Sequence, residues 1–474
     1  MKREDLLSKI SDPSKVWDVV VIGGGATGLG VAVDAVTRGY SVALFEWEDF
    51  AKATSSRSTK LVHGGVRYLA QGDVSLVLEA LYERGLLQQN APHLVKNQSF
   101  LIPNYRYWDN FLYTVGLTIY DILAGRLSLG RSKYVSKKKT TSYLPTVRVD
   151  GLKGGVVYHD GQFDDSRLAV NLAQSCVENG GCPINRMKVT AILHGSDGRA
   201  RGVKVQDLMN GQEYEVKAKA VINATGIFVD SIMEMDVPTH EHMVKPSQGV
   251  HLVLDKSFLQ SDYAIMIPKT DDGRVLFAVP WHDKVVVGTT DTLREHPELE
   301  PQALESEIEF ILNTAGRYLT RKPQRSDVLS VFAGLRPLAA PKKEGKSTKE
   351  ISRSHKIFVS ENKLITITGG KWTTYRRMAE DTVDKAIELN LLEKKECVTK
   401  KFRIHGYQLN PDLNNHLYIY GSDIQAIKTL MQSDPAMAEK LHPKYDYTVA
   451  EVVWAVREEM ALNVEDILAR RVRL

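Results

Sequence analysis

The chain has 474 residues, more than one hydrophobic core usually serves, so we expect two or three domains. Apolar residues make up 43% and charged residues 25% of the sequence, which is typical of globular proteins and excludes fibrous, collagen-like and wholly disordered chains. The formal net charge of +4 is too small to indicate a nucleic-acid partner, and the three cysteines have neither a CxxC spacing nor a paired framework, so we predict no metal site and no structural disulfide.

The N-terminal residues, 1–14, mix charged side chains with short apolar pieces and lack the continuous apolar core of a secretory signal. The most apolar long stretch, Trp108 to Gly125, is interrupted by Asp109 and Asp121. A transmembrane helix needs an apolar run of about 20 residues. We therefore expect an intracellular protein of a reducing compartment, without a transmembrane helix.

A βαβ unit is predicted at the start of the chain. Trp17–Ile22 is a short, β-branched apolar run and predicts a buried strand. From Ala26, small and apolar residues recur at helical spacing until Gly39, and Ser41–Phe45 predicts a second buried strand. Two parallel strands joined by a helix predict an α/β fold.

Glycines join the first strand to the helix in the pattern Gly23-x-Gly25-x-x-Gly28. This pattern lets the backbone pass close to a pyrophosphate, to which the helix N-terminus offers N–H donors. Glu46 ends the next strand, where a carboxylate can accept hydrogen bonds from an adenosine ribose. The arrangement predicts a dinucleotide site, either FAD or NAD; the alternative is a glycine-rich turn beside a surface glutamate.

Two later segments repeat the change from strand to glycine. Ala220–Ala224 runs into Thr225-Gly226, and Leu364–Thr368 runs into Gly369-Gly370 ahead of a helical pattern that starts at Thr373. In open α/β sheets, ligands bind beyond the carboxyl ends of the strands. We therefore expect these endings to converge on one cofactor and the dinucleotide-binding domain to be discontinuous.

The intervening sequence predicts an antiparallel sheet. Gly249–Leu254, Val275–Pro280 and Val285–Thr289 resemble strands separated by turn residues, and would form a domain on the substrate side. Pro341–Glu350 is polar and predicts an exposed loop, which is either an idle connector or a mobile lid.

The sequence after Leu392 predicts helices. Thr448 and Glu451 have the spacing of a capping box, and apolar residues follow at helical spacing. We therefore expect an all-helical C-terminal domain.

The residues that follow the βαβ unit distinguish FAD from NAD. Ala53–Lys60 (ATSSRSTK) precedes Leu61–Tyr68 (LVHGGVRY), and this stretch resembles the FAD-dependent glycerol-3-phosphate dehydrogenases of the D-amino-acid-oxidase-like flavoprotein group. Further motifs of that family are NATG, PW, GTTD, GLRP and GGKWTTY, which begin at Asn223, Pro280, Gly288, Gly334 and Gly369. The resemblance extends from about Trp17 into the C-terminal helices.

The resemblance implies FAD as the cofactor and an α/β architecture, in which a Rossmann-like FAD-binding domain is interleaved with an antiparallel-sheet substrate domain and followed by a C-terminal helical domain. The first part of the FAD-binding domain is predicted at residues 16–75 and the helical domain at 393–474. Residues 76–392 would hold the substrate (cap) domain and the remaining FAD-binding segments, at about 155–230 and 350–392. Family members usually continue through further helical sequence after the position of Leu474, so we expect the C-terminal domain to be truncated.

The resemblance also implies an activity, which is oxidation of sn-glycerol 3-phosphate to dihydroxyacetone phosphate. Hydride would pass from C2 of the substrate to flavin N5, and the electrons would pass to a membrane quinone. The protein would work in the cytoplasm, bound peripherally to the membrane surface, and a homodimer is compatible with the resemblance. The amphipathic stretch Tyr107–Leu123 and the basic cluster over residues 131–139 support membrane contact, although a core helix followed by a solvated loop is the alternative.

Small residues, neutral hydroxyls, one acid, one histidine and one lysine make up the cofactor-binding set that the resemblance implies. Its residues are Gly23, Gly25, Ala26, Thr27, Gly28, Glu46, Thr54, Ser55, Ser56, Ser58, His63, Gly64, Ala224, Thr225, Gly226, Gly370, Lys371 and Thr373. Hydroxyl donors suit a flavin and a pyrophosphate because they need no buried charge.

Cations and titratable groups make up the predicted catalytic set. Its residues are His63, Arg67, Tyr68, His251, Arg336 and Lys371. Arg67 and Arg336 resemble the family's phosphate-binding arginines, since a guanidinium grips a phosphate bidentately. Lys371 would either stabilise negative charge on reduced flavin or contact the substrate phosphate.

Two histidines are candidates for the base that takes the proton of the C2 hydroxyl. They are His63 and His251, and a purely structural role is the alternative for each. Tyr68 would assist by hydrogen bonding or pack as an ordinary tyrosine. Ile227 and Phe332-Ala333 depart from the family motifs, but neither departure removes a charged group.

Three other functions are compatible with flavin binding. An oxidase of the same group would reoxidise the flavin with oxygen, and an amine oxidase would act on glycine or sarcosine. The third is a flavin-binding regulator without turnover. The HGGVRYL and GGKWTTY motifs argue against the amine oxidase, and the cluster of titratable residues argues against the regulator.

Overall fold

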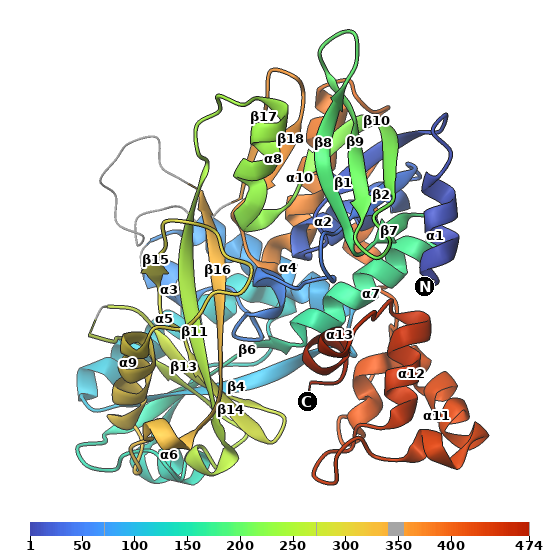
Figure 1. The fold of residues 1–474 in the computed structure, drawn as a ribbon. Coiled ribbons are helices and arrows are strands. Elements are labelled where there is room, and N and C mark those ends of the chain that lie inside the picture. The colour runs from blue at the N-terminus through green and yellow to red at the C-terminus, as the bar shows by residue number, and fades with distance from the viewer. Residues whose placement is uncertain (71, 272, 340–354, 474) are drawn as a thin grey trace.

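The chain folds around two large sheets, followed by a C-terminal group of helices. The computed structural model describes residues 1–473 except 71, 272 and 340–354, and within that range it omits the side chains of Arg67 and Ala70. In Figure 1 the first sheet lies in the upper half, the second lies below it, and the C-terminal helices lie at the lower right. The predicted loop Pro341–Glu350 falls outside the described residues.

The first sheet has eight strands, and its centre is parallel. Its main path is β17-β18-β10-β1-β2-β7, and β8 and β9 continue it as an antiparallel extension of β10. The strands in chain order are β1 (Val16–Ile22), β2 (Val42–Phe45), β7 (Cys182–Ile184), β8 (Met187–His194), β9 (Ala200–Asp207), β10 (Glu213–Asn223), β17 (Lys356–Val359) and β18 (Ile365–Thr368). Three sequence segments far apart in the chain therefore build one sheet.

The βαβ unit predicted at the start of the chain is confirmed by β1, α2 (Ala26–Thr37) and β2. Val19, Val20 and Val21 of β1 are fully buried, so both faces of this central strand are covered. A parallel strand covered on both faces has a continuous apolar sequence, as this one does. Helix α2 packs against α7 (Asp165–Glu178) and α10 (Tyr375–Glu388), and α1 (Arg3–Ile10) packs on β7.

The second sheet has ten strands and is mostly antiparallel. Its main path is β15-β11-β14-β13-β12-β4-β6-β3; β16 pairs with β11, and β5 pairs with β6. The strands are β3 (Leu61–Val62), β4 (Val95–Asn104), β5 (Lys133–Ser136), β6 (Gly154–Phe163), β11 (Val244–Asp255), β12 (Ala264–Ile267), β13 (Leu276–Trp281), β14 (Lys284–Gly288), β15 (Thr292–Leu293) and β16 (Val328–Ala339). This sheet includes the three antiparallel strands that the sequence predicts.

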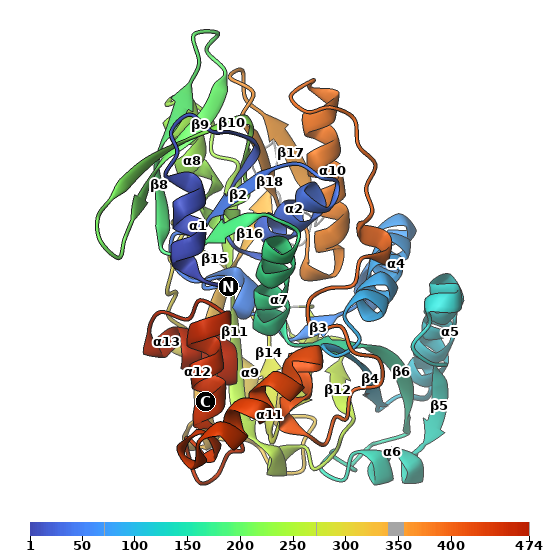
Figure 2. The ribbon, with the colours of Figure 1, turned by 90° about the vertical axis from the view of Figure 1, so that its right-hand side faces the viewer.

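Helices flank the second sheet and connect it with the first. They are α3 (Val66–Ala70), α4 (Val74–Asn90), α5 (Tyr107–Ala124), α6 (Lys137–Tyr143), α8 (Val229–Asp236) and α9 (Glu305–Gly316). Figure 2 shows α5 at the edge of the molecule, beside α4 and β5. The described helices include none that is both long enough and apolar enough to cross a bilayer.

The C-terminal part is helical, as predicted. It contains η8 (His416–Asp423), α11 (Ile424–Ser433), η9 (Pro435–Ala438), α12 (Val449–Glu458), α13 (Val464–Ile467) and η10 (Leu468–Val472). The capping box of α12 is present, with the Thr448 N–H donating to Glu451 Oε2 over 2.8 Å. The fold class is thus confirmed, whereas the domain boundaries inferred from the sequence stay a prediction.

The end of the chain returns to the first sheet through buried ion pairs. Arg470 and Arg471 both bind Asp49, and all three side chains are almost wholly buried. Burial alone would raise the pKa of Asp49, but the two guanidiniums outweigh it and lower that pKa to about 2. The carboxylate therefore stays charged at neutral pH and anchors the last helical turn.

Candidate active site

One large cavity lies where the carboxyl ends of the first sheet face the second sheet. Its volume is about 500 Å³, within the usual range for small-molecule and cofactor sites. Segments that follow β1, β10 and β18 all line it, namely Gly23–Thr27, Ala224–Gly226 and Gly369–Thr373. The strand ends converge on one cavity, as their shared sequence pattern predicts.

The glycine loop brings α2 close to β1. A Cβ on Gly28 would lie 1.9 Å from the Gly23 carbonyl oxygen, so only glycine allows this approach. Gly25 caps α2, and the Ala26 N–H donates to Ser55 Oγ over 2.9 Å. The N-terminus of α2 is thereby directed at the cavity, where its N–H groups can bind a pyrophosphate.

Glu46 lies in the cavity wall at the end of β2. Its carboxylate accepts hydrogen bonds from the Gly24 N–H over 2.6 Å and the Glu48 N–H over 2.8 Å. Burial nevertheless raises the pKa of Glu46 to about 7, because two backbone donors only partly replace lost water. When ionised, the Glu46 carboxylate in the cavity wall can accept further hydrogen bonds from a ribose.

The hydroxyl-rich segment after the βαβ unit joins the two sheets. Thr54 Oγ1 donates to the Leu335 carbonyl over 2.6 Å, and Ser58 Oγ donates to Asp165 over 2.7 Å. The Trp372 indole N–H donates to the Ser55 carbonyl over 2.8 Å. These contacts hold neutral hydroxyls in the cavity wall, where a flavin and a pyrophosphate can be bound without burying charge.

Arg336 projects from β16 into the cavity. Its guanidinium donates to the Thr290 carbonyl over 3.1 Å and to Thr289 Oγ1 over 3.0 Å, and it lies 3.6 Å from Asp291. A Cβ on Gly249 would lie 2.4 Å from Arg336 Nη2, so this glycine makes the space that the guanidinium fills.

A second cavity-lining guanidinium belongs to Arg274, which lies 3.8 Å from the other oxygen of Asp291. Arg274 was not predicted, although it directly follows a turn glycine ahead of β13. Two guanidiniums on one carboxylate form a cationic group that can bind a dianion.

His251 lies on β11 and is almost wholly buried. Its Nε2 is 2.8 Å from Thr59 Oγ1, and its ring stacks on Phe332 with 4.8 Å between centroids. A Cβ on Gly288 would lie 2.3 Å from the ring. Burial lowers the pKa of His251 well below its ordinary value, and nearby Arg336 and Lys60 lower it further. The imidazole is therefore neutral at physiological pH.

Lys371, Tyr68 and His63 also line the cavity. The Lys371 ammonium lies 4.0 Å from the centroid of the Tyr68 ring. The His63 N–H donates to Thr373 Oγ1 over 3.3 Å, which links the HGG segment to the segment after β18. Arg67 belongs to the same segment, on α3, but its side chain lies outside the description.

Three residues of the predicted cofactor set are absent from the cavity wall. Gly28 instead allows α2 to pack on the loop, and the Ser56 carbonyl accepts a hydrogen bond from Lys60 over 2.6 Å. The Gly64 N–H donates to Tyr120 Oη over 2.7 Å. The remaining predicted members line the cavity, and cofactor binding by any member of the set stays a prediction.

The cavity fits a dinucleotide with a flavin. At the α2 end, a Cβ on Gly25 would approach only Ser55 Oγ within 4 Å, so bare backbone faces the cavity there. Glu46 provides a ribose acceptor next to this loop, and hydroxyl donors continue to the segment after β18. His251 and Arg336 line the same cavity from strands β11 and β16 of the second sheet.

Comparisons with known families agree with this geometry. Residues 18–376 match the model of the FAD dependent oxidoreductase family, and residues 361–474 match the C-terminal domain of alpha-glycerophosphate oxidase.

Curated relatives cover the whole chain. The chain is 39% identical to a probable mitochondrial glycerol-3-phosphate dehydrogenase of Caenorhabditis elegans, over 100% of this chain and 69% of the relative. It is 40% identical to the mitochondrial glycerol-3-phosphate dehydrogenase SDP6 of Arabidopsis thaliana, over 98% of this chain and 80% of the relative.

Solved structures show the same fold. The glycerol-3-phosphate dehydrogenase from Bacillus halodurans, complexed with FAD, superposes with a TM-score of 0.79 and 30% identity, over 99% of this chain and 88% of that chain. L-alpha-glycerophosphate oxidase from Mycoplasma pneumoniae has a TM-score of 0.62 at 17% identity, over 82% of this chain and 98% of that chain, which shows a shared fold alone.

Replacing Glu46 with Gln should weaken FAD binding. The ionised carboxylate is the better acceptor for ribose hydroxyls, and with a pKa of about 7 it becomes protonated as the pH falls below neutrality. FAD affinity of the wild type should therefore rise as the pH increases through about 7, whereas that of Glu46→Gln should be lower and lack this step. Titration of deflavinated protein with FAD measures both effects. Flavin fluorescence follows the binding at pH values from about 5.5 to about 8.5, on both sides of neutrality. Equal pH dependence in the two proteins would exclude this role for Glu46.

Proposed function

This chain belongs to the family of FAD-dependent glycerol-3-phosphate dehydrogenases, and from this premise we propose that it oxidises sn-glycerol 3-phosphate to dihydroxyacetone phosphate and passes the electrons to a membrane quinone. The observation that carries the proposal is the shared cavity. A glycine loop, hydroxyl donors and an acid line one side, and two arginines and a buried neutral histidine line the other. This combination suits a dinucleotide together with a phosphorylated alcohol.

The arginines would bind the substrate phosphate. Arg336 and Arg274 both face Asp291, which keeps the two guanidiniums together before substrate enters. A phosphate dianion has the charge and the oxygens to bind both, with bidentate geometry at each guanidinium. Arg67 is proposed as a further phosphate ligand from the HGGVRY segment.

The histidine would hold the proton released from the C2 hydroxyl. His251 is neutral and faces the cavity, and Thr59 fixes its ring through Nε2. A neutral imidazole can accept a proton, whereas an imidazolium cannot. His63 remains the second candidate, because it lines the same cavity.

The remaining site residues would bind the cofactor and align the substrate with it. Bound FAD supplies the hydride acceptor, which lets an alcohol be oxidised to a ketone. Lys371 and Tyr68 lie on the segments that line this part of the cavity, where the ammonium can stabilise nearby negative charge. The loop of Gly23–Thr27 would bind the pyrophosphate, and Glu46 would bind the adenosine ribose.

We propose that the exposed face of α5 contacts the cytoplasmic side of the membrane. Trp108, Phe111, Val115, Ile119 and Ile122 recur at helical spacing, and they are between 43% and 71% exposed. Contiguous exposed apolar surface of this kind marks an interaction site.

Basic residues beside α5 would contact lipid headgroups. These basic residues are exposed. Arg131 lies just before β5, Lys133 begins β5, and residues 137–139 form the first turn of α6. An apolar face with flanking cations is typical of helices that lie in a membrane interface. Electron transfer to a quinone is proposed on this basis, because quinones are dissolved in the bilayer.

The alternative acceptor is oxygen. The match of residues 361–474 to the C-terminal domain of alpha-glycerophosphate oxidase keeps an oxidase as the second candidate function. The two functions share substrate and cofactor, so only the fate of the electrons separates them.

Anaerobic mixing with sn-glycerol 3-phosphate should bleach the absorbance of the oxidised flavin, whereas glycerol and sarcosine should leave it unchanged. Replacement of Arg336 with Lys keeps the charge but loses bidentate binding, and should lower kcat/KM roughly 100-fold through a raised KM. Stopped-flow absorbance measures the bleaching, and a quinone analogue or a peroxide assay identifies the acceptor. Bleaching by sarcosine, or none with the phosphate ester, would refute the proposed substrate; peroxide formed in step with turnover would favour the oxidase.

The pH dependence of kcat/KM should distinguish the two histidines. Because the pKa of His251 lies well below its ordinary value, the rate should not fall through an inflection near pH 6.5, about the ordinary pKa of histidine. His251→Asn should lower kcat by roughly 100-fold or more without a matching rise in KM. An inflection near that pH that disappears in His63→Asn would assign the proton to His63.

Substitution of Phe111 and Ile122 by Glu should abolish binding to anionic liposomes. Each side chain contributes about 1.5–3 kcal/mol when buried in an apolar phase, so the partition coefficient should fall roughly 100-fold or more. Co-sedimentation measures binding, and bleaching by substrate in solution should persist. Leu409→Glu, at an equally exposed position far along the chain, is the matched control. Unchanged sedimentation of the double variant would exclude α5, and a simultaneous loss of dimers in gel filtration would instead identify its face as a subunit interface.

A further inference from the structure

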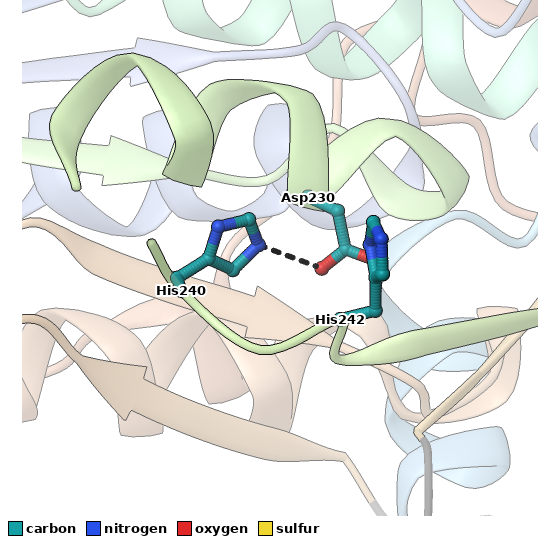
Figure 3. A group of neighbouring side chains, drawn as sticks. All are labelled: Asp230, His240 and His242. Atoms are coloured by element: carbon teal, nitrogen blue, oxygen red, sulfur yellow. Dashed lines mark ion pairs between the residues drawn. The ribbon is translucent and has the colours of Figure 1, made fainter. Parts of the chain in front are cut away.

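The segment that connects α8 with β11 gathers three potential metal ligands outside the cavity. Asp230 lies in the first turn of α8, and His240 and His242 lie in the connecting segment that leads to Val244. Figure 3 shows the two imidazoles on either side of the carboxylate. One ligand atom of each residue lies within 4.8 Å of the others. The sequence predicts no metal site, but that prediction rests on the cysteine spacing and does not consider these three residues.

The two imidazoles approach different oxygens of the same carboxylate. His240 Nε2 lies 3.5 Å from Asp230 Oδ1, and His242 Nδ1 lies 3.6 Å from Asp230 Oδ2. Tetrahedral ligands bound at 2.0–2.1 Å are separated by about 3.3–3.5 Å, given usual zinc geometry. Small side-chain rotations would therefore bring the group to the spacing that a zinc ion requires.

His240 is the residue whose environment needs explanation. Its side chain is 7% exposed, and neither of its ring nitrogens has a hydrogen-bond partner among the described residues. Its contact with Asp230, at 3.5 Å, is at an ion-pair distance and is not a hydrogen bond. Buried polar groups are normally satisfied. A buried imidazole that lies beside a carboxylate and makes no hydrogen bond through its ring nitrogens is suited to metal coordination.

The backbone holds the aspartate in place. The carboxylate accepts hydrogen bonds from the Met243 N–H over 2.9 Å and the Val244 N–H over 3.3 Å. Such supporting contacts orient metal-binding carboxylates in known sites. His242 is 78% exposed, so an ion can reach the group directly from solvent.

We propose that Asp230, His240 and His242 form a binding site for a divalent zinc ion, with solvent at the fourth position. Two imidazoles and one carboxylate are ligands that suit Zn²⁺, whereas Mg²⁺ and Ca²⁺ prefer oxygen alone.

The bound ion would restrain the segment from α8 to β11, which connects the first sheet with the second. Ser231, Ile232 and Met235 of α8 line the cavity, and β11 carries His251 at the opposite wall. Metal binding at the start of α8 would restrain the segment between these two walls. The site is separate from the proposed catalytic groups, so its test does not depend on turnover.

Isothermal titration of the FAD-loaded protein, free of any affinity tag, with zinc chloride tests the proposal. One equivalent should bind to the wild type, and His242→Ala should bind at least 10-fold more weakly, as expected for the loss of one ligand. His242 is the residue to change because its exposed side chain can be removed without disturbing packing. His296→Ala removes another exposed histidine and should bind zinc like the wild type. Equal affinity of wild type and His242→Ala would overturn the proposal.

Chemical labelling identifies the residues that bind. Diethyl pyrocarbonate should modify His242 readily in the metal-free protein, and saturating zinc should protect it, while His296 stays reactive. Magnesium at the same concentration should give no protection. Peptide mass spectrometry reads both sites in one sample. Modification of His242 that is unchanged by zinc would exclude it as a ligand, even if zinc binds elsewhere.

Discussion

The close approach of α2 to β1 is the constraint on which the site depends. Because a Cβ on Gly28 would lie 1.9 Å from the Gly23 carbonyl, the helix can reach this position only with glycine there. The approach fixes the N-terminus of α2 at the carboxyl edge of the sheet, where the other glycine-ended strands also finish. A pyrophosphate site then follows from the orientation of the helix and needs no buried cation at that point.

Buried charges hold the second sheet and the chain end against this first unit. Asp165 at the start of α7 pairs with Lys60 over 2.7 Å and with Arg473 over 3.1 Å, and it also accepts from Ser58. Burial lowers the pKa of Lys60, whereas the carboxylate of Asp165 opposes this shift by stabilising the charged ammonium. Since loss of one partner leaves an uncompensated buried charge, such a group fixes geometry more than it adds stability. It positions the hydroxyl segment that lines the cavity between the sheets.

Local patterns made the first sheet and the C-terminal helices predictable, because a strand, a glycine turn and a capping box each depend on neighbouring residues. The convergence of three strand ends was predictable too, from a general property of parallel sheets. Arg274 and Thr59 are absent from the predicted site because their roles come from contacts with Asp291 and His251, which no local sequence pattern reveals. The glycine motif predicts that Gly28 is needed, and the close contact with the Gly23 carbonyl supplies a packing reason for it. Sequence spacing thus identifies which segments meet, and packing decides which of their atoms face the cavity.

Helix α5 connects the proposed membrane surface with the catalytic cavity through one side chain. On its buried face, Tyr120 donates to Asp160 over 2.7 Å and accepts from the Gly64 N–H over 2.7 Å, and Asp160 pairs with Arg84. The opposite face of the same helix carries the exposed apolar residues. A helix that was only a core element would not expose that face, and one that was only a lipid anchor would not need a hydrogen bond to the HGG segment. The proposed membrane contact therefore lies on the same helix that supports the HGG segment, and His63 of that segment lines the cavity.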